Sequence, residues 1–196
     1  MSTPPSRSRA TAGWATSAST SCPRLVERGK VVAHPLPGYW RDLGQPHKYL
    51  RAHFDVLTDD LGVLDRPDWT INTRQRTRVA ARVLAGAEVV DSLVSPGCRV
   101  AGRVERSVLG PGVVVGEGAV VRHSVVFADC VIEAGATLDG TILDTGCVIG
   151  AGAFVGGAGP AVAEDPDLVT LVGRGSTVAA GVRVEAGGRL EPGTTA

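Results

Sequence analysis

Residues 107–155 read SVLGPGVVVGEGAVVRHSVVFADCVIEAGATLDGTILDTGCVIGAGAFV, and an aliphatic side chain recurs along them at nearly constant spacing. The positions are Leu109, Val115, Val121, Val126, Ile132, Leu138, Leu143, Ile149 and Val155, so the spacing is always six or five. Every third position is separated by the same interval, which places Leu109, Val126 and Leu143 in one column. Such a period predicts short, equivalent units that stack on one another.

A second column lies two residues before each aliphatic residue, and its members are small. They are Ser107, Val113, Ala119, Ser124, Cys130, Ala136, Thr141, Cys147 and Ala153. The same pairing recurs earlier at Val94 and Val100 and later as far as Leu190. Short strands that point alternate residues inward, broken by Gly about every six positions, build a parallel β-helix with three hexapeptides to a coil.

This pattern resembles the hexapeptide-repeat family with a left-handed parallel β-helix, and the resemblance covers about residues 89–193. The chain is therefore expected to be mainly all-β, with the β-helix domain at residues 89–196. One long gap, from Val155 to Val172, departs from the period and is rich in Gly, Pro and acidic residues. It predicts a loop at 156–169, for which a solvated excursion is favoured over a ligand-binding role.

The composition excludes several classes of protein. The chain has 196 residues, of which 43% are hydrophobic and 20% charged, with a formal net charge of zero. This is too apolar for a fully disordered chain, and it lacks the basic excess that a nucleic-acid-binding protein needs. No run of apolar residues is long enough for a membrane-spanning helix, so none is expected. Residues 1–88 carry a net charge of +5 and residues 89–196 a net charge of −5, which indicates two different regions.

The amino-terminal residues 1–22 are rich in Ser, Thr, Ala and Arg and contain no acidic residue. A mitochondrial presequence has a similar composition, but Pro4 and Pro5 and the missing amphipathic stripe argue against one. The segment has no apolar core of a secretory signal either. We interpret it as a disordered tail, or one that is not native to the ancestral reading frame.

The four cysteines, Cys22, Cys98, Cys130 and Cys147, match no zinc or CxxC spacing. Three of them occupy the small column of the repeat, and Cys130 and Cys147 stand one full coil apart within it. A buried Cys behaves as a small hydrophobic residue. The sequence therefore favours a packing role over a redox or metal role, in a reducing, cytoplasmic setting.

Residues 23–88 lack the hexapeptide period. Residues 31–34 indicate a short strand, and residues 45–57 place apolar side chains at helical spacing, with Pro46 suited to the first turn. Between them lies the turn-like stretch Gly38-Tyr39-Trp40-Arg41-Asp42-Leu43-Gly44.

That stretch, followed by a helix and then a hexapeptide β-helix, resembles the sugar-1-phosphate nucleotidyltransferases, and among them the glucose-1-phosphate adenylyltransferase (ADP-glucose pyrophosphorylase) family. The resemblance is carried by residues 39–44, 49–52, 67–71, 92–98 and 107–109, and it spans about residues 23–193. It implies that residues 23–88 are the end of a catalytic domain and a connector, a short α/β remnant before the β-helix. It also implies glycogen or related glucan synthesis from ATP and glucose 1-phosphate, and a homo-oligomer formed through the β-helix.

The resemblance further assigns roles to single residues. Asp42 matches the aspartate that helps to hold the catalytic Mg²⁺, and Trp40 borders the same site. The alternatives are that Asp42 pairs with Arg41 or caps the next helix, and that Trp40 only packs. The resemblance also implies that regulatory sugar phosphates or nucleotides bind near the domain interface. The candidate anion-binding residues are Arg99, Arg103, Arg106 and Arg122. The alternative is that these arginines only belong to the solvated exterior of the coil.

The sequence departs from the family pattern where the chemistry is most demanding. No Gly-rich phosphate loop of the G-x-G-x-R kind occurs near the start, and Lys30 and Lys48 are the only lysines. Nucleotidyl transfer depends on positioning and charge neutralisation, which one Asp cannot supply. We expect a carboxy-terminal portion that is inactive alone and that uses ATP and glucose 1-phosphate only if a catalytic domain is supplied.

Three other functions remain open. One is a portion of another sugar-1-phosphate nucleotidyltransferase with a different nucleotide or sugar. Another is a hexapeptide acyltransferase, for which His123 is the candidate general base; its place in one of the shortened steps predicts a coil corner exposed to solvent. The third is a non-catalytic assembly module made of the β-helix alone.

Overall fold

The computed structural model of the chain describes residues 17–29, 31–32, 34–58, 68, 72 and 77–196. The chain divides into two compact units, Met1–Gly38 and Tyr39–Ala196. All of the strands among the described residues belong to the second unit. The stretch 67–71, which carried part of the family resemblance, lies outside the described residues except for Asp68.

The first unit contains the helix α1 (Ser17–Glu27), which is followed by Gly29, where a positive φ of 67° lets the N–H bond back to the Val26 carbonyl at 2.9 Å. Residues 17–22, part of the predicted unstructured tail, lie in this helix. The strand predicted at 31–34 is not formed at residues 31, 32 and 34. An isolated strand gains nothing without a partner, and Ala33 lies outside the described residues.

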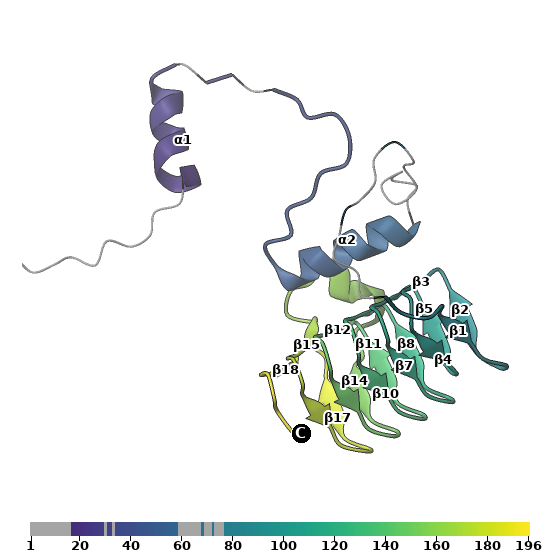
Figure 1. Cartoon of the computed structure of the whole chain (residues 1–196). Coiled ribbons are helices and arrows are strands. Elements are labelled where there is room, and N and C mark those ends of the chain that lie inside the picture. Colours follow the sequence, from purple (N-terminus) through teal and green to yellow (C-terminus); the bar gives the residue numbers. More distant parts are fainter. Residues whose placement is uncertain (1–16, 30, 33, 59–67, 69–71, 73–76) are drawn as a thin grey trace, which may run out of the picture. The chain divides into compact units, whose positions relative to one another are not determined.

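The second unit is built on three parallel sheets of six strands each (Figure 1). The first sheet contains β1 (Arg82–Val83), β4 (Arg99–Val100), β7 (Val114–Val115), β10 (Val131–Ile132), β13 (Val148–Ile149) and β16 (Thr177–Val178). The second contains β2 (Glu88–Val90), β5 (Arg103–Glu105), β8 (Val120–Arg122), β11 (Thr137–Asp139), β14 (Phe154–Gly156) and β17 (Arg183–Glu185). The third contains β3 (Leu93–Val94), β6 (Val108–Leu109), β9 (Val125–Val126), β12 (Thr141–Leu143), β15 (Thr170–Val172) and β18 (Arg189–Leu190).

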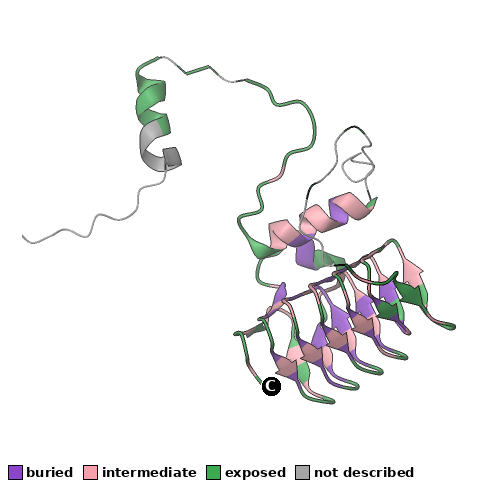
Figure 2. Ribbon diagram, viewed as in Figure 1, coloured by how far each residue is buried: buried purple, intermediate pink, exposed green. Residues whose placement is uncertain are grey.

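The register of the strands follows the sequence period. Leu138 pairs with Val121 in the coil before and with Val155 in the coil after, at equal distances along the chain. All nine aliphatic residues of the repeat are 0% exposed, and the small column before them is buried as well (Figure 2). The predicted hexapeptide β-helix is confirmed. Removal of this apolar surface from water stabilises the fold by about 1.5–3 kcal/mol for each large side chain.

The small column also satisfies the backbone at the corners. Between the second and third sheets, the Ser124 N–H donates to Ser107 Oγ and the Thr141 N–H donates to Ser124 Oγ, both at 3.1 Å. The Ser124 hydroxyl in turn donates to the Arg122 carbonyl at 2.7 Å. These hydroxyls form a ladder from coil to coil, which explains why this corner uses Ser and Thr.

The cysteines fill the same column at another corner. Cys98, Cys130 and Cys147 are buried, as predicted, and each thiol lies within hydrogen-bonding distance of a carbonyl oxygen of the next coil, at 3.1, 3.0 and 3.1 Å. Burial raises the pKa of the Cys98 thiol, and contact with Cys147 together with burial raises the pKa of Cys130. Burial therefore keeps the Cys98 thiol protonated at neutral pH, whereas the contact between Cys130 and Cys147 lowers the pKa of Cys147 to about 7.

The β-helix starts earlier than the period predicts and contains one short step. β1 begins at Arg82, ahead of the predicted start at 89, and Val104 is a fully buried member of the aliphatic column. Val104 follows Val100 after a step of only four, which hid it from the period of six. The shorter turn also shortens the offset between paired strands, so that Arg99 pairs with Val114.

The helix α2 (Pro46–Thr58) confirms the predicted helix and covers the outer face of the third sheet (Figure 1). Its Leu50 and Phe54 pack in one cluster with Val125 of β9. The segment between β14 and β15 contains the short 3₁₀ helix η1 (Gly159–Ala163). Its Val162 is 0% exposed and belongs to the same cluster as Leu50 and Phe54. The prediction of a solvated excursion at 156–169 was wrong, because its apolar residues pack against α2.

Neither described helix could cross a lipid bilayer. α1 has 11 residues and α2 has 13, whereas a membrane span needs about 20 predominantly apolar residues.

Candidate functional site

Two networks of charged side chains lie where α2 meets the β-helix. The first surrounds Asp55, which is 6% exposed. The Tyr39 hydroxyl donates to Asp55 Oδ2 at 2.8 Å, Arg41 Nη2 pairs with the same oxygen at 2.6 Å, and Arg51 Nε donates to Oδ1 at 3.2 Å. Burial and the hydrogen bond to the Asp55 carboxylate raise the pKa of Tyr39. We call this group the Asp55 network.

The Asp55 network extends to the insertion after β14. Arg51 forms a further ion pair with Glu164, which follows η1. Arg51 therefore joins α2 to the insertion, which is residues 157–169 between β14 and β15. Arg41 joins α2 to the stretch of chain that precedes this helix. Since two cations flank one buried carboxylate, the network fixes the path of residues 39–55 over the β-helix.

The second network surrounds Asp139 at the end of β11, which is 2% exposed. His123 Nδ1 lies 3.1 Å from Oδ1, Arg122 Nε forms an ion pair with Oδ2 at 3.1 Å, and the Gly159 N–H donates to Oδ2 at 3.2 Å. Burial alone would raise the pKa of Asp139, but the hydrogen bond from His123 and the charge of Arg122 outweigh it and lower the pKa. We call this group the Asp139 network.

His123 occupies the predicted coil corner, with a positive φ of 48°. Its side chain is only 12% exposed, however, because the Phe54 ring of α2 lies edge-on at 6.1 Å between centroids. The predicted solvent exposure was therefore wrong. An imidazole oriented by a carboxylate is the arrangement that a general base uses, but in this protein the helix restricts access to it.

Asp42, the candidate magnesium ligand, is engaged in a local turn. Its carboxylate accepts hydrogen bonds from the Gly44 N–H and from Lys48 Nζ, both at 3.0 Å, and these partners lower the pKa of Asp42, Lys48 foremost. Arg41 pairs with Asp55 instead. Among the described residues, no group of three or more His, Cys, Asp or Glu side chains could hold a metal ion.

Mg²⁺ needs one or two free carboxylates together with substrate phosphates, so the described residues do not fit the ion by themselves. Trp40, predicted to border the same site, is 70% exposed.

The four candidate anion-binding arginines do not form one site. Arg99 lies on the first sheet, and Arg103 pairs with Glu88 at 2.8 Å on the second. Arg122 belongs to the Asp139 network. Arg106 lies next to α2, with its guanidinium 6.0 Å from the centre of the Phe54 ring.

A hollow of about 310 Å³ opens beside Arg106, and Arg51, Thr58 and Glu164 also line it. Arg106 has no carboxylate partner among the described residues. Sequence reasoning missed Arg51, Asp55, Asp139 and Glu164. Only the helical spacing between Arg51 and Asp55, one turn apart, could have indicated a pair.

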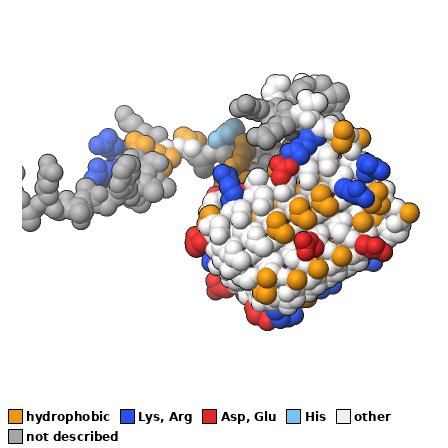
Figure 3. Space-filling view, turned by 60° about the horizontal axis from the view of Figure 1, so that its bottom comes forward, with side chains coloured by type: hydrophobic (Ala, Val, Ile, Leu, Met, Phe, Trp, Pro, Cys, Tyr) orange, Lys and Arg blue, Asp and Glu red, His pale blue; other side chains and the backbone are white. Residues whose placement is uncertain are grey.

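Apolar surface also remains open around the β-helix. A hollow of about 340 Å³ lies between the start of α2 and the third sheet, lined by Leu43, Tyr49, Phe127 and Leu171. Hydrophobic side chains run in rows, with charged ones between them, across the face drawn in Figure 3. Such rows follow from the stacking of equivalent outward positions from one coil to the next.

The three sheets and the buried columns of the repeat define a hexapeptide β-helix fold, and a family model agrees with that fold. Residues 78–165 match the family model described as GlmU-like, C-terminal hexapeptide. A solved structure entitled "Crystal structure of CcmM N-terminal domain in complex with CcmN" is 22% identical and covers 60% of this chain and 98% of that chain, with a TM-score of 0.21.

The carboxy-terminal half of the chain is similar to glucose-1-phosphate adenylyltransferases. The enzyme of Streptomyces coelicolor is 38% identical over an alignment of 113 positions, and the match covers 51% of this chain and 28% of that protein. The enzyme of Geobacillus stearothermophilus is 41% identical over an alignment of 100 positions, and the match covers 50% of this chain and 26% of that protein. The predicted resemblance is confirmed for this half, and the match spans about a quarter of the relatives' length.

Proposed function

We propose that this chain acts as the β-helix portion of a glucose-1-phosphate adenylyltransferase, which converts ATP and glucose 1-phosphate to ADP-glucose and pyrophosphate. Nucleotidyl transfer is carried by a catalytic region outside the described residues, and this chain alone has no turnover. The observation that carries the proposal is the 33–41% identity to these enzymes, which lies in the half of the chain that forms the β-helix.

The chemistry of the described residues supports the second part of the proposal. Asp42 is paired with Lys48 and the Gly44 N–H, so this carboxylate is not free to hold Mg²⁺. Transfer to a sugar phosphate requires several groups that neutralise the triphosphate at once. The Asp55 and Asp139 networks instead neutralise their own charges, as expected of groups that hold a helix in place.

A chimeric enzyme tests the proposal. Residues 77–196 replace the matching carboxy-terminal part of the Streptomyces coelicolor enzyme, and pyrophosphate release from ATP and glucose 1-phosphate is measured. The chimera is expected to retain activity within about tenfold of the parent, since the β-helix supports rather than performs the chemistry. A matched chimera carrying Leu138→Ala, which opens a core cavity, should lose activity on mild heating. A folded chimera without activity would contradict the proposal.

Within this function, we propose that the hollow beside Arg106 takes anionic effectors, such as sugar phosphates. Among the described residues Arg106 has no carboxylate partner, and Arg51, which is paired with Asp55 and Glu164, lines the same hollow. Arg99, Arg103 and Arg122 are left out of the proposed site, because none of them lines this hollow. Phosphate titrated into the full chain, which contains both walls of the hollow, should bind at least tenfold more weakly after Arg106→Ala, whereas Arg99→Ala should leave binding unchanged.

We also propose that the chain forms homo-oligomers through the β-helix and resides in the cytoplasm. The first sheet presents the half-exposed side chains Val114, Val131 and Val148 outward in one column. Sedimentation at micromolar concentration should give a particle mass of more than one protomer. The Val131→Glu substitution should shift that mass towards the monomer. A strictly monomeric parent chain would contradict the oligomer.

Acyl transfer is the second candidate function. It is supported by the contact between His123 Nδ1 and Asp139 at 3.1 Å, which would orient the imidazole as a base. Acetyl-CoA turnover that is abolished by His123→Ala but not by His53→Ala would favour this candidate. Absence of turnover with a range of amine and hydroxyl acceptors would remove it.

A further inference from the structure

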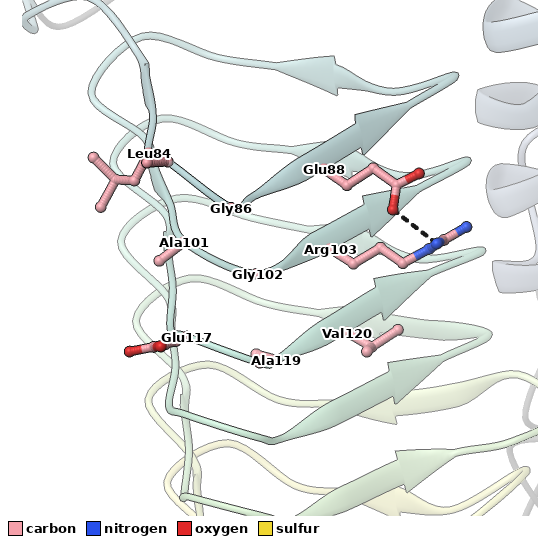
Figure 4. Close-up of a pocket in the computed structure, with 11 residues that line it drawn as sticks. Leu84, Gly86, Glu88, Ala101, Gly102, Arg103, Glu117, Ala119 and Val120 are labelled. Atoms are coloured by element: carbon pink, nitrogen blue, oxygen red, sulfur yellow. Dashed lines mark hydrogen bonds and ion pairs between the residues drawn. The ribbon is translucent and has the colours of Figure 1, made fainter.

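A notch interrupts the wall of the β-helix at the corner between the first and second sheets (Figure 4). It has a volume of about 540 Å³ and is lined by three successive turns, with Leu84, Ala101 and Glu117 stacked along one side. The middle turn causes the notch. It has two residues, Ala101 and Gly102, whereas the turn before it spans residues 84–87 and the turn after it spans residues 116–119.

In the regular four-residue turns, the peptide group in the middle of the turn bonds to the coil on either side. The peptide between Ala134 and Gly135 donates its N–H to the Glu117 carbonyl at 2.9 Å. Its carbonyl accepts from the Gly152 N–H at 3.0 Å. The following coil repeats the arrangement, because the Ala151 carbonyl accepts from the Gly181 N–H at 2.9 Å. This corner is therefore a stack of trans secondary amides, each of which donates to one side and accepts from the other.

The two-residue turn removes one amide from this stack. The Ala85 carbonyl and the Gly118 N–H, which border the notch, consequently have no hydrogen-bond partner among residues 77–196 or the other described residues. In the stacking order they stand two coils apart, a separation of about 10 Å. One trans amide between them would complete both hydrogen bonds, as the 134–135 peptide does between its own neighbours.

The short turn is a fixed feature of the fold. A Cβ at Gly102 would lie 2.2 Å from the Ala119 carbonyl oxygen and 2.7 Å from that of Gly116, so only glycine fits against the next coil. Val104, directly after the turn, is 0% exposed and anchors the chain in the core. The notch therefore cannot close by movement of its own floor.

We propose that the notch binds one trans secondary amide, presented by a tight turn of a partner polypeptide. The amide N–H donates to the Ala85 carbonyl, and its carbonyl accepts from the Gly118 N–H. A peptide turn suits the gap, because the gap is one coil layer thick and this chain's own turns fill the same space elsewhere.

The charges around the notch describe the partner turn further. Glu88 pairs with Arg103 at 2.8 Å, whereas Glu117 has no ion pair among the described residues. A basic residue beside the bound amide would therefore complement the rim. This site is independent of the proposed adenylyltransferase role.

The test uses the full chain labelled with ¹⁵N and a probe peptide, acetyl-Ile-Arg-Ala-Gly-Ala-amide. The probe copies residues 132–136 with arginine in place of Glu133. Saturable shifts of the Gly118 amide signal are expected. A matched peptide with an N-methyl group on its Ala-Gly amide keeps the carbonyl but cannot donate, and it should bind at least tenfold more weakly.

A second variant supplies the amide covalently, by insertion of Ala-Gly between Ala101 and Gly102. The insertion should abolish binding of the probe and raise Tm by about 2–4 °C, because two backbone groups gain partners. Equal binding to both chains, or no shift of Gly118 at millimolar probe, would overturn the proposal. Saturation of the site by N-acetylglucosamine but not by the peptide would also overturn it, as would equal binding of the two peptides.

Discussion

Two apolar clusters hold the second unit together, and they differ in what lies beside them. The interior of the β-helix contains aliphatic and small side chains, and its buried polar atoms are hydroxyls and thiols that bond to the backbone. The cluster under α2 packs Leu50, Val125 and Val162 from three distant segments. It is bordered by the two buried carboxylates Asp55 and Asp139. We call α2 together with the insertion between β14 and β15 the cap. The interior is held by apolar packing and hydrogen bonds to the backbone, whereas the cap is also held by charged groups that pair with one another.

The interior should be the more sensitive region. Leu138→Ala removes a fully buried side chain from the middle of the stack, and we expect a loss of about 3–5 kcal/mol in the free energy of unfolding. Urea titration followed by circular dichroism measures it. Val114→Ala, on the outer face of the first sheet, is the matched control and should cost less than about 1 kcal/mol. Equal losses would show that the interior column does not dominate stability.

The cap should respond locally. Leu50→Ala is expected to cost about 2–3 kcal/mol, and its effect should be confined to α2 and the insertion, because the coils hold themselves together. Hydrogen exchange would report this as loss of protection at residues 46–58 while residues 107–155 stay protected. If exchange rises equally in both ranges, the cap and the coils are one cooperative unit.

The Asp139 network predicts a dependence on pH. The pKa of Asp139 is lowered in the folded state. Its contribution to the free energy of unfolding is therefore complete above the unfolded pKa of about 4, and it is lost as the pH falls below that value through the folded pKa. Asp139→Asn should therefore cost about 1–3 kcal/mol at pH 7, and the difference from the parent should shrink below pH 4. Thermal melts of both chains between pH 3 and pH 7 measure this. A difference that stays constant across that range would contradict the assigned pKa direction.

The hydroxyl ladder should have a smaller effect. Ser124→Ala leaves the Thr141 N–H without its acceptor inside the wall, at an expected cost of about 1–2 kcal/mol. Ser124→Thr keeps the hydroxyl and should cost less than the alanine variant, as measured by urea titration. The reverse order would mean that the column selects for size rather than for hydrogen bonding.

Asp42 should have the smallest effect of all. Its partners lie at the surface, and such pairs contribute little, so Asp42→Asn should change stability only marginally. In calorimetry, the parent chain and the Asp42→Asn variant should show the same Mg²⁺ binding. Stoichiometric binding that depends on Asp42 would contradict the local role described above.

The sequence predicted the two regions unequally, for physical reasons. The interior repeats two buried positions in every short step, so the columns at Leu138 and Ala136 could be found without a structure. Val104 escaped because its turn is shorter than the others. The cap depends on contacts such as that of Arg51 with Glu164, which lie far apart along the chain, and no local pattern records such a pair. Asp42 was proposed from resemblance alone, and Lys48 and Gly44 satisfy its carboxylate locally.

We proposed that this chain supports nucleotidyl transfer without performing it. Pyrophosphate release by the purified chain in ATP, glucose 1-phosphate and Mg²⁺ tests that role most directly, beside the Streptomyces coelicolor enzyme as a positive control. We expect a rate no higher than that of the protein-free blank. Release that requires both substrates and is lost in Asp42→Asn would contradict it.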